Sequence, residues 1–307
     1  MITNLAPENA LFVADVNRIQ QRIAEANNQV SSGKKINVAS DAPDQIDTLL
    51  QLRANLQHNT QVQSNLTLAT TDANAADNAL GSSIQLMDSA MSLASQGATA
   101  TMDAAGRLSI AQQIQAIQQQ MVSYSQTTVQ GRFIFSGDQD TLPVYSWDST
   151  APNPVVQESN PVSTRLIEDA SGGSFPASQR AQEIFDDRDP VTGNPTANNV
   201  FNALNSLYQA LQNNDTAGIN SAIPLLKSAS GQLNTMQAFY GNVENRIQNA
   251  SNFASSYDVQ LQTQISQTED ADITSAAMEL TQANTQLQAA FEMHGQAPHS
   301  SLFNYLG

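Results

Sequence analysis

Few residues of this 307-residue sequence stand at a spacing that could support chemistry. The chain has three histidines and no cysteine, so disulfides, thiolate nucleophiles and cysteine-ligated metals are excluded. His294 and His299 are five positions apart, and His58 has no second histidine four residues on. Histidine pairs that bind a metal from one helix need a shared face, which neither arrangement provides. We therefore interpret all three histidines as surface or tail residues.

The acidic group Asp186, Asp187 and Asp189 lacks the glycine and the distal glutamate of a calcium loop, so we interpret it as a solvated loop. The sequence contains neither a glycine-rich phosphate loop nor a GxSxG string. We expect no catalytic, cofactor-binding or metal-binding residues. An enzyme is therefore not indicated.

Tyr145 and Trp147 form the aromatic pair on which a sugar-binding or adhesive module would have to depend. A small hydrophobic core is the simpler explanation of the same pair. The adhesive alternative stays open at this point.

Composition argues against several classes of partner. Acidic residues outnumber basic ones by 28 to 12, and the resulting net charge of −16 disfavours binding to phosphate backbones and to anionic membranes. The start of the sequence lacks the features of a secretory signal, and no stretch approaches 18 consecutive apolar residues. We expect no nucleic-acid binding and no membrane insertion. The chain is expected either to remain in the cytoplasm or to be exported without a signal of that kind.

Long helices dominate the predicted structure. From Ile46 to Ala94, apolar or small residues recur in steps of three or four. A continuous helix over this span would be about 70 Å long at 1.5 Å per residue, and it could not bury its apolar stripe alone. The stripe skips a step near His58, where we expect a local bend or a change of twist.

A second heptad near the start of the chain consists of Phe12, Val16, Ile19, Ile23, Ala26 and Val30. Its steps of four and three predict a helix of about twenty residues. The pattern alone favours an ordinary amphipathic helix over an intermolecular seam, because helices of globular proteins have much the same periodicity.

Further helices are indicated along the chain. A return helix with a stripe from Ile110 to Thr128 can fold back along the first long helix, and Asp103 is a possible cap at its start. A shorter helix spans about 201–211. A second very long helix is predicted after a break at 213–218, with Pro224 in its first turns and an apolar stripe from Leu226 to Leu261. After an acidic interruption at 268–272, a last helix contains Ile273, Ala277, Leu280, Leu287 and Phe291.

The turn between the first two helices has clear signals. Gly33 suits a left-handed cap at the end of the first helix, where Lys34 and Lys35 would lie near its carbonyl end. Ser40 or Asp41 can cap the next helix. Pro43 then falls in the first turn of that helix, where its missing N–H is harmless.

The pattern changes at Gly131, after which prolines become frequent. Strands are predicted at 132–137, 144–147, 155–157 and 163–167. We expect five parts: an N-terminal assembly helix (1–40), two parts of a helical rod (41–130 and 199–268) around a β-rich insertion (131–198), and a C-terminal assembly helix (269–307). The predicted fold class is mainly α, an elongated rod of long antiparallel coiled-coil-like helices with a small β-rich inserted domain.

Three strings in this sequence form recognisable motifs. The first lies in the turn after the first helix, the second where the return helix gives way to the first predicted strand, and the third at 300–306. The motif residues of the first two are Ser31, Ser32, Gly33, Asn37, Asp41 and Pro43, then Gly131, Arg132, Phe133, Phe135 and Gly137. These strings resemble the flagellin superfamily. The first is similar to the family's turn into its first rod helix, and the other two are similar to its hook-associated members.

The resemblance covers roughly residues 1–137 and 225–307. It implies an extracellular structural protein that is exported through the flagellar type III channel and joins a homo-oligomeric ring between hook and filament. The implied partners are other copies of the chain, a neighbouring hook-associated protein, flagellin and an export chaperone. A flagellin that forms the filament itself is the alternative.

The resemblance also implies terminal segments that are disordered in the monomer and form helical contacts on assembly. Short helices with a narrow apolar stripe are marginal in isolation, so association would supply the missing cover. This consideration reverses the preference for an ordinary first helix. We expect an assembly interface made by Phe12, Val16, Ile19, Ile23, Val30, Ile273, Ala277, Leu280, Leu287 and Phe291.

Overall fold

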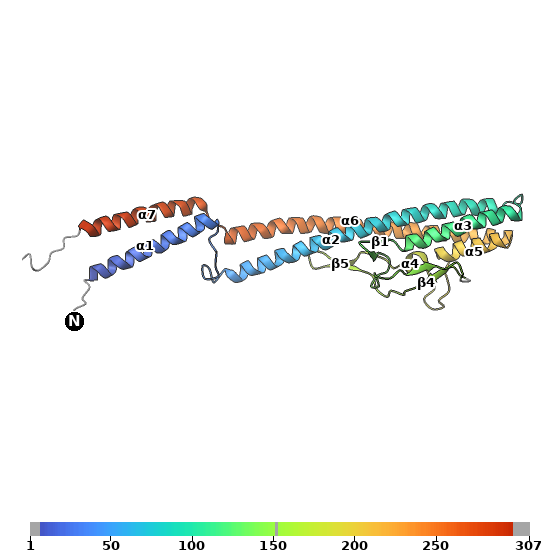
Figure 1. The fold of residues 1–307 in the computed structure, drawn as a ribbon, viewed down its shortest axis with the longest axis horizontal. Coiled ribbons are helices and arrows are strands. Elements are labelled where there is room, and N and C mark those ends of the chain that lie inside the picture. The colour runs from blue at the N-terminus through green and yellow to red at the C-terminus, as the bar shows by residue number, and fades with distance from the viewer. Residues whose placement is uncertain (1–6, 151–152, 297–307) are drawn as a thin grey trace, which may run out of the picture. The chain divides into compact units, whose positions relative to one another are not determined.

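The computed structural model describes residues 7–150 and 153–296 (Figure 1). The helices are α1 (Pro7–Ser32), α2 (Ile46–Gly97), α3 (Ala104–Ser125), α4 (Ala181–Phe185), α5 (Val200–Gln212), α6 (Thr216–Glu269) and α7 (Ile273–Gln296). The strands are β1 (Thr128–Val129), β2 (Arg132–Phe133), β3 (Tyr145–Trp147), β4 (Val155–Gln157), β5 (Leu166–Glu168) and β6 (Ser174–Pro176). Long helices with a small strand-containing region confirm the predicted mainly α fold class.

The described chain divides into two compact units. Of the described residues, the first unit contains 7–58 and 258–296, and the second contains 59–150 and 153–257. Helices α2 and α6 each contribute to both units. The division of α2 falls between His58 and Asn59, where the apolar stripe skips a step. The bend expected there stays a prediction.

In the second unit, α2 and α6 run antiparallel and side by side (Figure 1). The side-chain amide of Asn59 donates to the backbone carbonyl of Ala254 at 2.8 Å. At the other end of the pair, a Cβ placed on Gly97 would lie 3.8 Å from Ile219. The predicted stripe of α2 is buried here, together with residues of α3, α5 and α6. The core includes Leu66, Leu80, Met87, Ile114, Met121, Leu204, Leu207, Leu226 and Leu233.

Polar contacts define the turn between α2 and α3. The Asp103 carboxylate accepts from the Gly106 N–H at 2.8 Å, which confirms its predicted role as a cap. Buried Arg107 donates to the carbonyls of Gly97 and Thr99 at 2.9 and 3.0 Å. Carbonyl groups at a helix end have no partner within the helix, so this arginine satisfies groups that would otherwise be costly to bury.

Two predicted helix ends were wrong. Helix α6 begins at Thr216, early in the break expected at 213–218, because Asp215 accepts hydrogen bonds from the N–H groups of Ala217 and Gly218. Pro224 therefore lies inside α6 and not in its first turns. Helix α3 ends at Ser125, so Thr128 belongs to β1.

The strands form three antiparallel pairs, β1–β2, β3–β4 and β5–β6. The strand predicted at 155–157 is confirmed, and those predicted at 144–147 and 163–167 begin later than expected, at Tyr145 and Leu166. The prediction at 132–137 is right only for its first two residues, because the following segment turns inward and buries Phe135. Strand β6 and helix α4 were missed, since elements of three and five residues are too short to show a period.

Candidate assembly site

Helices α1 and α7 pack antiparallel within the first unit. The ring centroids of Phe12 and Phe291 lie 5.9 Å apart with an edge-to-face angle of 74°. Further along the pair, the Nε of Arg22 donates to the carboxylate of Glu279 at 2.6 Å. His294 lies with its ring 4.0 Å from that of Phe12. Phe12 thus faces the end of α7, while Arg22 faces its beginning.

The pair buries little of its apolar surface. Among the described side chains of α1 and α7, those fully buried are Ala26, Ala276 and Ala283. Of the ten predicted assembly residues, six are half-buried: Phe12, Val16, Ile19, Ile23, Leu280 and Leu287. The other four are exposed: Val30, Ile273, Ala277 and Phe291. The α1 stripe is therefore only partly covered in a single chain.

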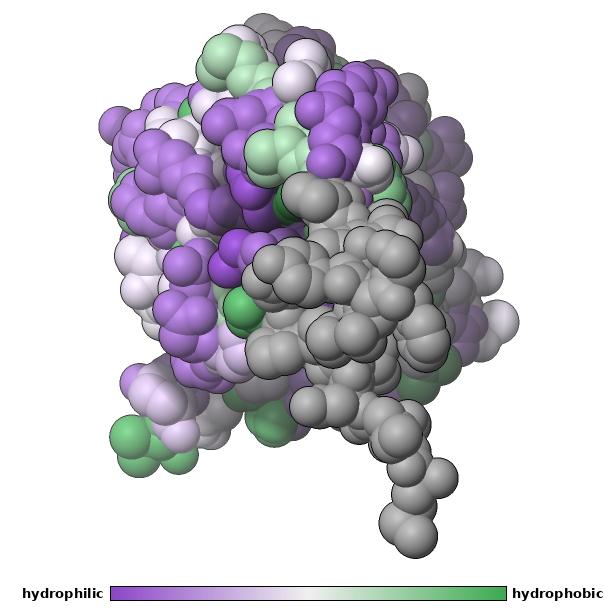
Figure 2. Space-filling view, turned by 90° about the vertical axis from the view of Figure 1, so that its left-hand side faces the viewer, coloured by the Kyte–Doolittle hydropathy of each residue, from purple (hydrophilic) through white to green (hydrophobic). Residues whose placement is uncertain are grey.

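Large apolar side chains also lie on the outer surfaces of both helices. Leu11 is 67% exposed on α1, and Met278 and Met293 are 61% and 72% exposed on α7. A shallow hollow beside Met278 is lined by Ala277, Thr281 and other residues of α7. Figure 2 shows separate apolar side chains, in green, on a mostly hydrophilic face. Exposed methionine and leucine side chains are typical of protein-binding surfaces.

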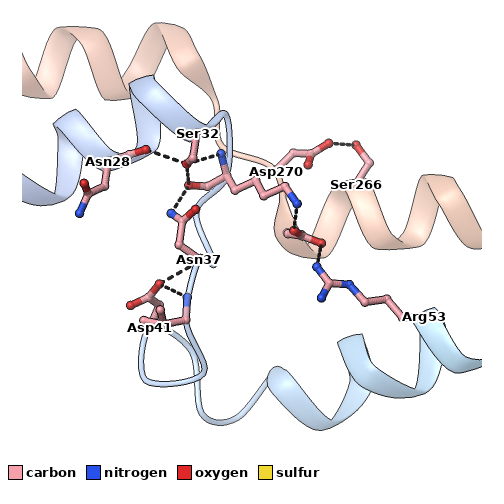
Figure 3. Close-up of polar contacts among 10 residues, drawn as sticks. Asn28, Ser32, Asn37, Asp41, Arg53, Ser266 and Asp270 are labelled. Atoms are coloured by element: carbon pink, nitrogen blue, oxygen red, sulfur yellow. Dashed lines mark hydrogen bonds and ion pairs between the residues drawn. The ribbon is translucent and has the colours of Figure 1, made fainter.

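The turn after α1 is held by its own side chains (Figure 3). Gly33 has φ +73°, the left-handed conformation predicted for the cap, and its N–H donates to the Gln29 carbonyl at 2.9 Å. Asn37 donates through its side chain to the Lys34 carbonyl at 3.1 Å. The Ser32 hydroxyl donates to the Asn28 carbonyl at 2.7 Å. Ser31 and Ser32 are the last residues of α1.

Asp41 has a different role from the predicted one. Its carboxylate accepts from the backbone N–H groups of Val38 and Asn37 at 2.9 and 2.8 Å, and these bonds, in that order, lower the pKa of Asp41. Asp41 therefore closes the preceding loop and does not cap α2. The Ala42 carbonyl instead accepts from the N–H groups at 45 and 46, so Pro43 lies in the turn before α2 and not in its first turn.

Glu269 is the centre of the contacts around this turn. Its side chain is 4% exposed and forms ion pairs with Lys34 and with Arg53, the latter at 2.6 Å. Burial raises the pKa of Glu269, but the hydrogen bonds from Lys34 and then Arg53 outweigh burial and lower it. Its backbone carbonyl accepts from the Lys35 N–H at 2.8 Å. Glu269 thus joins the end of α6 to the turn after α1 and to α2.

Sequence reasoning missed this cluster. Arg53 and Glu269 are 216 positions apart, and no local pattern connects them. Both lysines were expected at the carbonyl end of α1. Instead Lys34 binds Glu269, and the Lys35 ammonium donates to the carbonyl of Gln267 at 3.3 Å, so both reach the end of α6. One signal of this cluster was present in the sequence, namely the pair of lysines beside the glycine cap. Two adjacent cations indicate that acceptors lie nearby, but they do not identify which residues supply them.

The second motif, 131–137, lies in the second unit. Gln130 and Gly131 both have positive φ and join β1 to β2 in the geometry of a type I′ hairpin turn. Arg132 in β2 lies 3.4 Å from the Asp72 carboxylate of α2, and Phe133 is half-buried. The motif therefore contacts the long helix directly where the strands begin.

The end of this motif enters the core of the second unit. Phe135 is fully buried, with edge-to-face contacts to Phe185 at 5.8 Å and to Tyr240 at 6.2 Å. Gly137 lies against the backbone of Ser163, where a Cβ would come within 2.2 Å of the carbonyl oxygen. These motif residues position the insertion and are not brought together with the turn after α1.

The acidic group at 186–189 differs from the expected solvated loop at Asp186, which is buried, while Asp187 and Asp189 are half-buried. Asp186 is 4% exposed and accepts from the Tyr145 hydroxyl at 3.0 Å, from Asn199 at 2.6 Å and from Arg188 at 2.9 Å. Burial, followed by the charge of Asp186, raises the pKa of Tyr145. This network connects β3 to the start of α5, since Asn199 caps that helix. Tyr145 therefore belongs to the core and presents no aromatic face for a sugar.

No metal-binding group of three or more histidine, cysteine, aspartate or glutamate side chains occurs among the described residues. His294 packs on Phe12, and His299 lies outside the described part of the chain. A search of the described residues also finds no helix long and apolar enough to cross a membrane.

Long paired helices, a β insertion fixed to them, and terminal helices with partly uncovered apolar stripes define a helical structural protein. The N-terminal helical region of bacterial flagellin matches residues 3–140, and its C-terminal helical region matches residues 223–306. Together these matches cover more than two thirds of the chain, which therefore belongs to the bacterial flagellin family and is a structural protein of the flagellum.

Several solved structures of flagellar proteins are similar to this chain in fold. A protein from Vibrio parahaemolyticus assigned to the hook-associated class is 20% identical with a TM-score of 0.63, over 75% of this chain and all of that one. FlgL from Xanthomonas campestris is 18% identical with a TM-score of 0.59, over 70% and 99% of the chains. The flagellar junction protein FlgL from Legionella pneumophila is 12% identical with a TM-score of 0.55, over 72% and 98%. No curated protein matches the sequence.

Proposed function

We propose that this chain forms the junction between hook and filament by self-association through α1 and α7. The observation that carries the proposal is the incomplete cover of these helices. Leu11, Met278 and Met293 are more than half exposed in the single chain. In a bundle that contains more helices than this pair, such side chains could be buried. Covering one leucine or methionine side chain contributes about 1.5–3 kcal/mol. A ring of copies would supply that cover.

Similarity in fold to hook-associated proteins supports the junction over the bulk filament. The proposed partners are other copies of the chain, a neighbouring hook-associated protein on one side and flagellin on the other. An export chaperone and the flagellar type III channel would bring the chain to an extracellular site. The proposed role is structural and not catalytic.

Deletion of the gene in its source bacterium tests the junction role. We expect complete hooks without filaments and flagellin shed into the medium, because filament subunits would have no surface on which to start. Expression of the wild-type chain from a plasmid should restore filaments. Normal filaments in the deletion strain would contradict the proposal.

A filament-forming flagellin is the second candidate, since both family matches are to flagellin regions. Purified protein added to hook fragments separates the two. A junction protein should bind in a fixed amount and stop, whereas a flagellin should extend without limit. Electron microscopy of seeded samples measures the difference, and continued growth at increasing protein concentration would favour the filament.

A further inference from the structure

An open groove of about 420 Å³ lies in the second unit, between α6 and the tip of the β5–β6 hairpin. Arg246, Asn249 and Phe253 line it from α6, and Asp169 and Ser171 line it from the hairpin. Its volume falls within the range of about 300–1,000 Å³ that ligand pockets occupy. All of these residues belong to the second unit, so the groove depends only on contacts within that unit.

A partly exposed aromatic ring borders the groove. The side chain of Phe253 is 50% exposed. The ring of Tyr257, one helical turn further on, lies 6.2 Å from that of Phe253 at an interplanar angle of 14°. This near-parallel contact limits the rotation of Phe253, so the groove has a flat apolar surface of fixed orientation. Flat aromatic surfaces suit ligands that present C–H groups from a flat face of their own.

Arg246 and Asp169 line the same groove but form no ion pair with each other. The guanidinium of Arg246 lies 4.3 Å from the ring centroid of Phe175, a cation–π contact that holds it against β6. The Asp169 Oδ1 atom accepts from the N–H groups of Ser171 and Gly173 at 2.9 and 3.0 Å, so its own turn holds the carboxylate. Within the described part of the chain, Asp169 Oδ2 accepts no hydrogen bond and is not buried, and Arg246 donates none. Each group is therefore fixed in place and open to a ligand.

The charges of the groove balance. Arg246 and Asp169 are the charged residues that line it, one cation and one anion. Hydrogen bonds from Ser171 and Gly173, and then the charge of Arg246, lower the pKa of Asp169, so its carboxylate is ionised at neutral pH. A ligand that spans the two groups must offer a donor to the carboxylate and an acceptor to the guanidinium. Neighbouring hydroxyl groups offer both, because each hydroxyl can donate and accept.

We infer that this groove binds a neutral saccharide, whose C–H face lies on the Phe253 ring and whose hydroxyl groups bridge Asp169 Oδ2 and Arg246. A pyranose ring has hydroxyl groups around its edge and C–H groups on its faces, so it matches an aromatic ring and a separated pair of charges together. The Asn249 side chain adds an amide donor and acceptor to the same groove. An apolar side chain of a partner protein would cover the ring but would leave both charged groups without a partner, and this difference favours the saccharide.

NMR titration of the full-length chain with the methyl glycosides of glucose, galactose, mannose and N-acetylglucosamine tests the inference. We expect at least one glycoside to shift the amide signals of 169–173 and 249–253. Phe253→Leu should weaken this binding about tenfold, which corresponds to about 1.4 kcal/mol, because leucine is apolar but has no flat face. Phe291→Leu is the matched control, since that ring is 53% exposed on α7 and does not line the groove. Its binding should equal that of the wild type.

Arg246→Lys gives a second measurement, because it keeps the positive charge beside Phe175 but loses the planar guanidinium and most of its donors. We expect it to weaken glycoside binding at least about fivefold. Separate titrations with neutral oligosaccharides from animal glycoproteins and from the envelope of the source bacterium show which source binds more tightly, and tighter binding of either supports the inference.

Failure of every glycoside and oligosaccharide to shift these signals would overturn the inference. Equal binding of glycerol would also overturn it, because glycerol has hydroxyl groups but no ring face. Unchanged glycoside binding by Phe253→Leu, or shifts caused by apolar peptides and by no saccharide, would overturn it as well.

Discussion

Glu269 shows how one residue can connect segments that are distant in sequence. Its carboxylate forms ion pairs with Lys34 and Arg53, and its backbone carbonyl accepts from the Lys35 N–H. Nearby, the Ala271 N–H donates to the Gly33 carbonyl at 2.9 Å. These contacts explain why a glycine cap is followed by two lysines in the first motif.

The ionisation of Glu269 should make the first unit sensitive to acid. Because its folded pKa lies below the ordinary value of 4.5, its contribution to stability is complete above about pH 4.5. That contribution is lost as the pH falls through the folded pKa. We expect Glu269→Gln to cost about 1–3 kcal/mol at pH 7 and to reduce the loss of stability below pH 4.5.

Amide hydrogen exchange at Lys35 and Ala271, measured between pH 3 and 7, checks this prediction. Glu25→Gln on the exposed side of α1 is the control and should change neither rate. Identical pH profiles for Glu269→Gln and the wild type would argue against the assigned role.

Gly33 permits a second test at the residue scale. Its φ of +73° is strained for any residue with a Cβ, while no atom lies within 4 Å of the added carbon, so Gly33→Ala isolates the backbone effect. We expect a loss of about 1–2 kcal/mol in the free energy of unfolding. Gly231→Ala within α6 also meets no atom, and there alanine should stabilise by about 0.5–1 kcal/mol. Urea unfolding monitored by circular dichroism compares them, and the same sign for both would refute the argument.

At the scale of elements, α1 and α7 contrast with the helices of the second unit. Helices α3 and α5 bury isoleucine, leucine and methionine, whereas α1 and α7 fully bury only alanines among their described side chains. A helix of this length has little stability of its own and depends on packing. The terminal helices are therefore the elements most dependent on further contacts.

Substitutions of exposed residues on these helices should impair assembly without impairing folding. We expect the double variant Leu11→Ser and Met278→Ser to keep the helical content of the monomer but to reduce binding to hook fragments at least about tenfold, because each removed side chain forfeits about 1.5 kcal/mol or more of burial. Leu108→Ser, which is 47% exposed on α3, is the matched control. Sedimentation with hook fragments measures binding, and unchanged binding by the double variant would exclude this surface.

At the scale of the whole molecule, the two units should differ in local stability. The second unit contains most of the large buried side chains, and among its described residues the first has Ile36, Leu49 and Leu261. We expect amides in the middle of α1 and α7 to exchange at least about a hundredfold faster than those of α3 in the monomer, since local opening follows the number of buried apolar contacts.

Hydrogen exchange with mass spectrometry compares the monomer with protein bound to hook fragments. Protection of α1 and α7 should rise on binding, while that of α3 stays constant. Full protection of both terminal helices in the free monomer would contradict the proposed assembly surface.

Hydrophobic periodicity and capping residues were sufficient to predict the long helices from the sequence. The stripe of α2, the Asp103 cap and the glycine at position 33 act within a few residues, so the sequence determined them. The short strands carry too few residues to show a period, and their inward turn at Phe135 depends on rings from α4 and α6. Pro224 was misplaced because the cap at Asp215 extends α6 backward beyond the apolar stripe.

The features that bear on function also divide into those that local sequence determines and those that depend on tertiary contacts. The sequence by itself determined the mainly helical class, the two terminal heptads and the motif strings, because these depend on neighbours along the chain. Only the tertiary structure decided that Glu269 meets Lys34 and Arg53, that Asp186 is buried, and that Asp72 pairs with Arg132 and Arg165. Those contacts join residues far apart in sequence, and the energy of each depends on burial and geometry that exist only after folding.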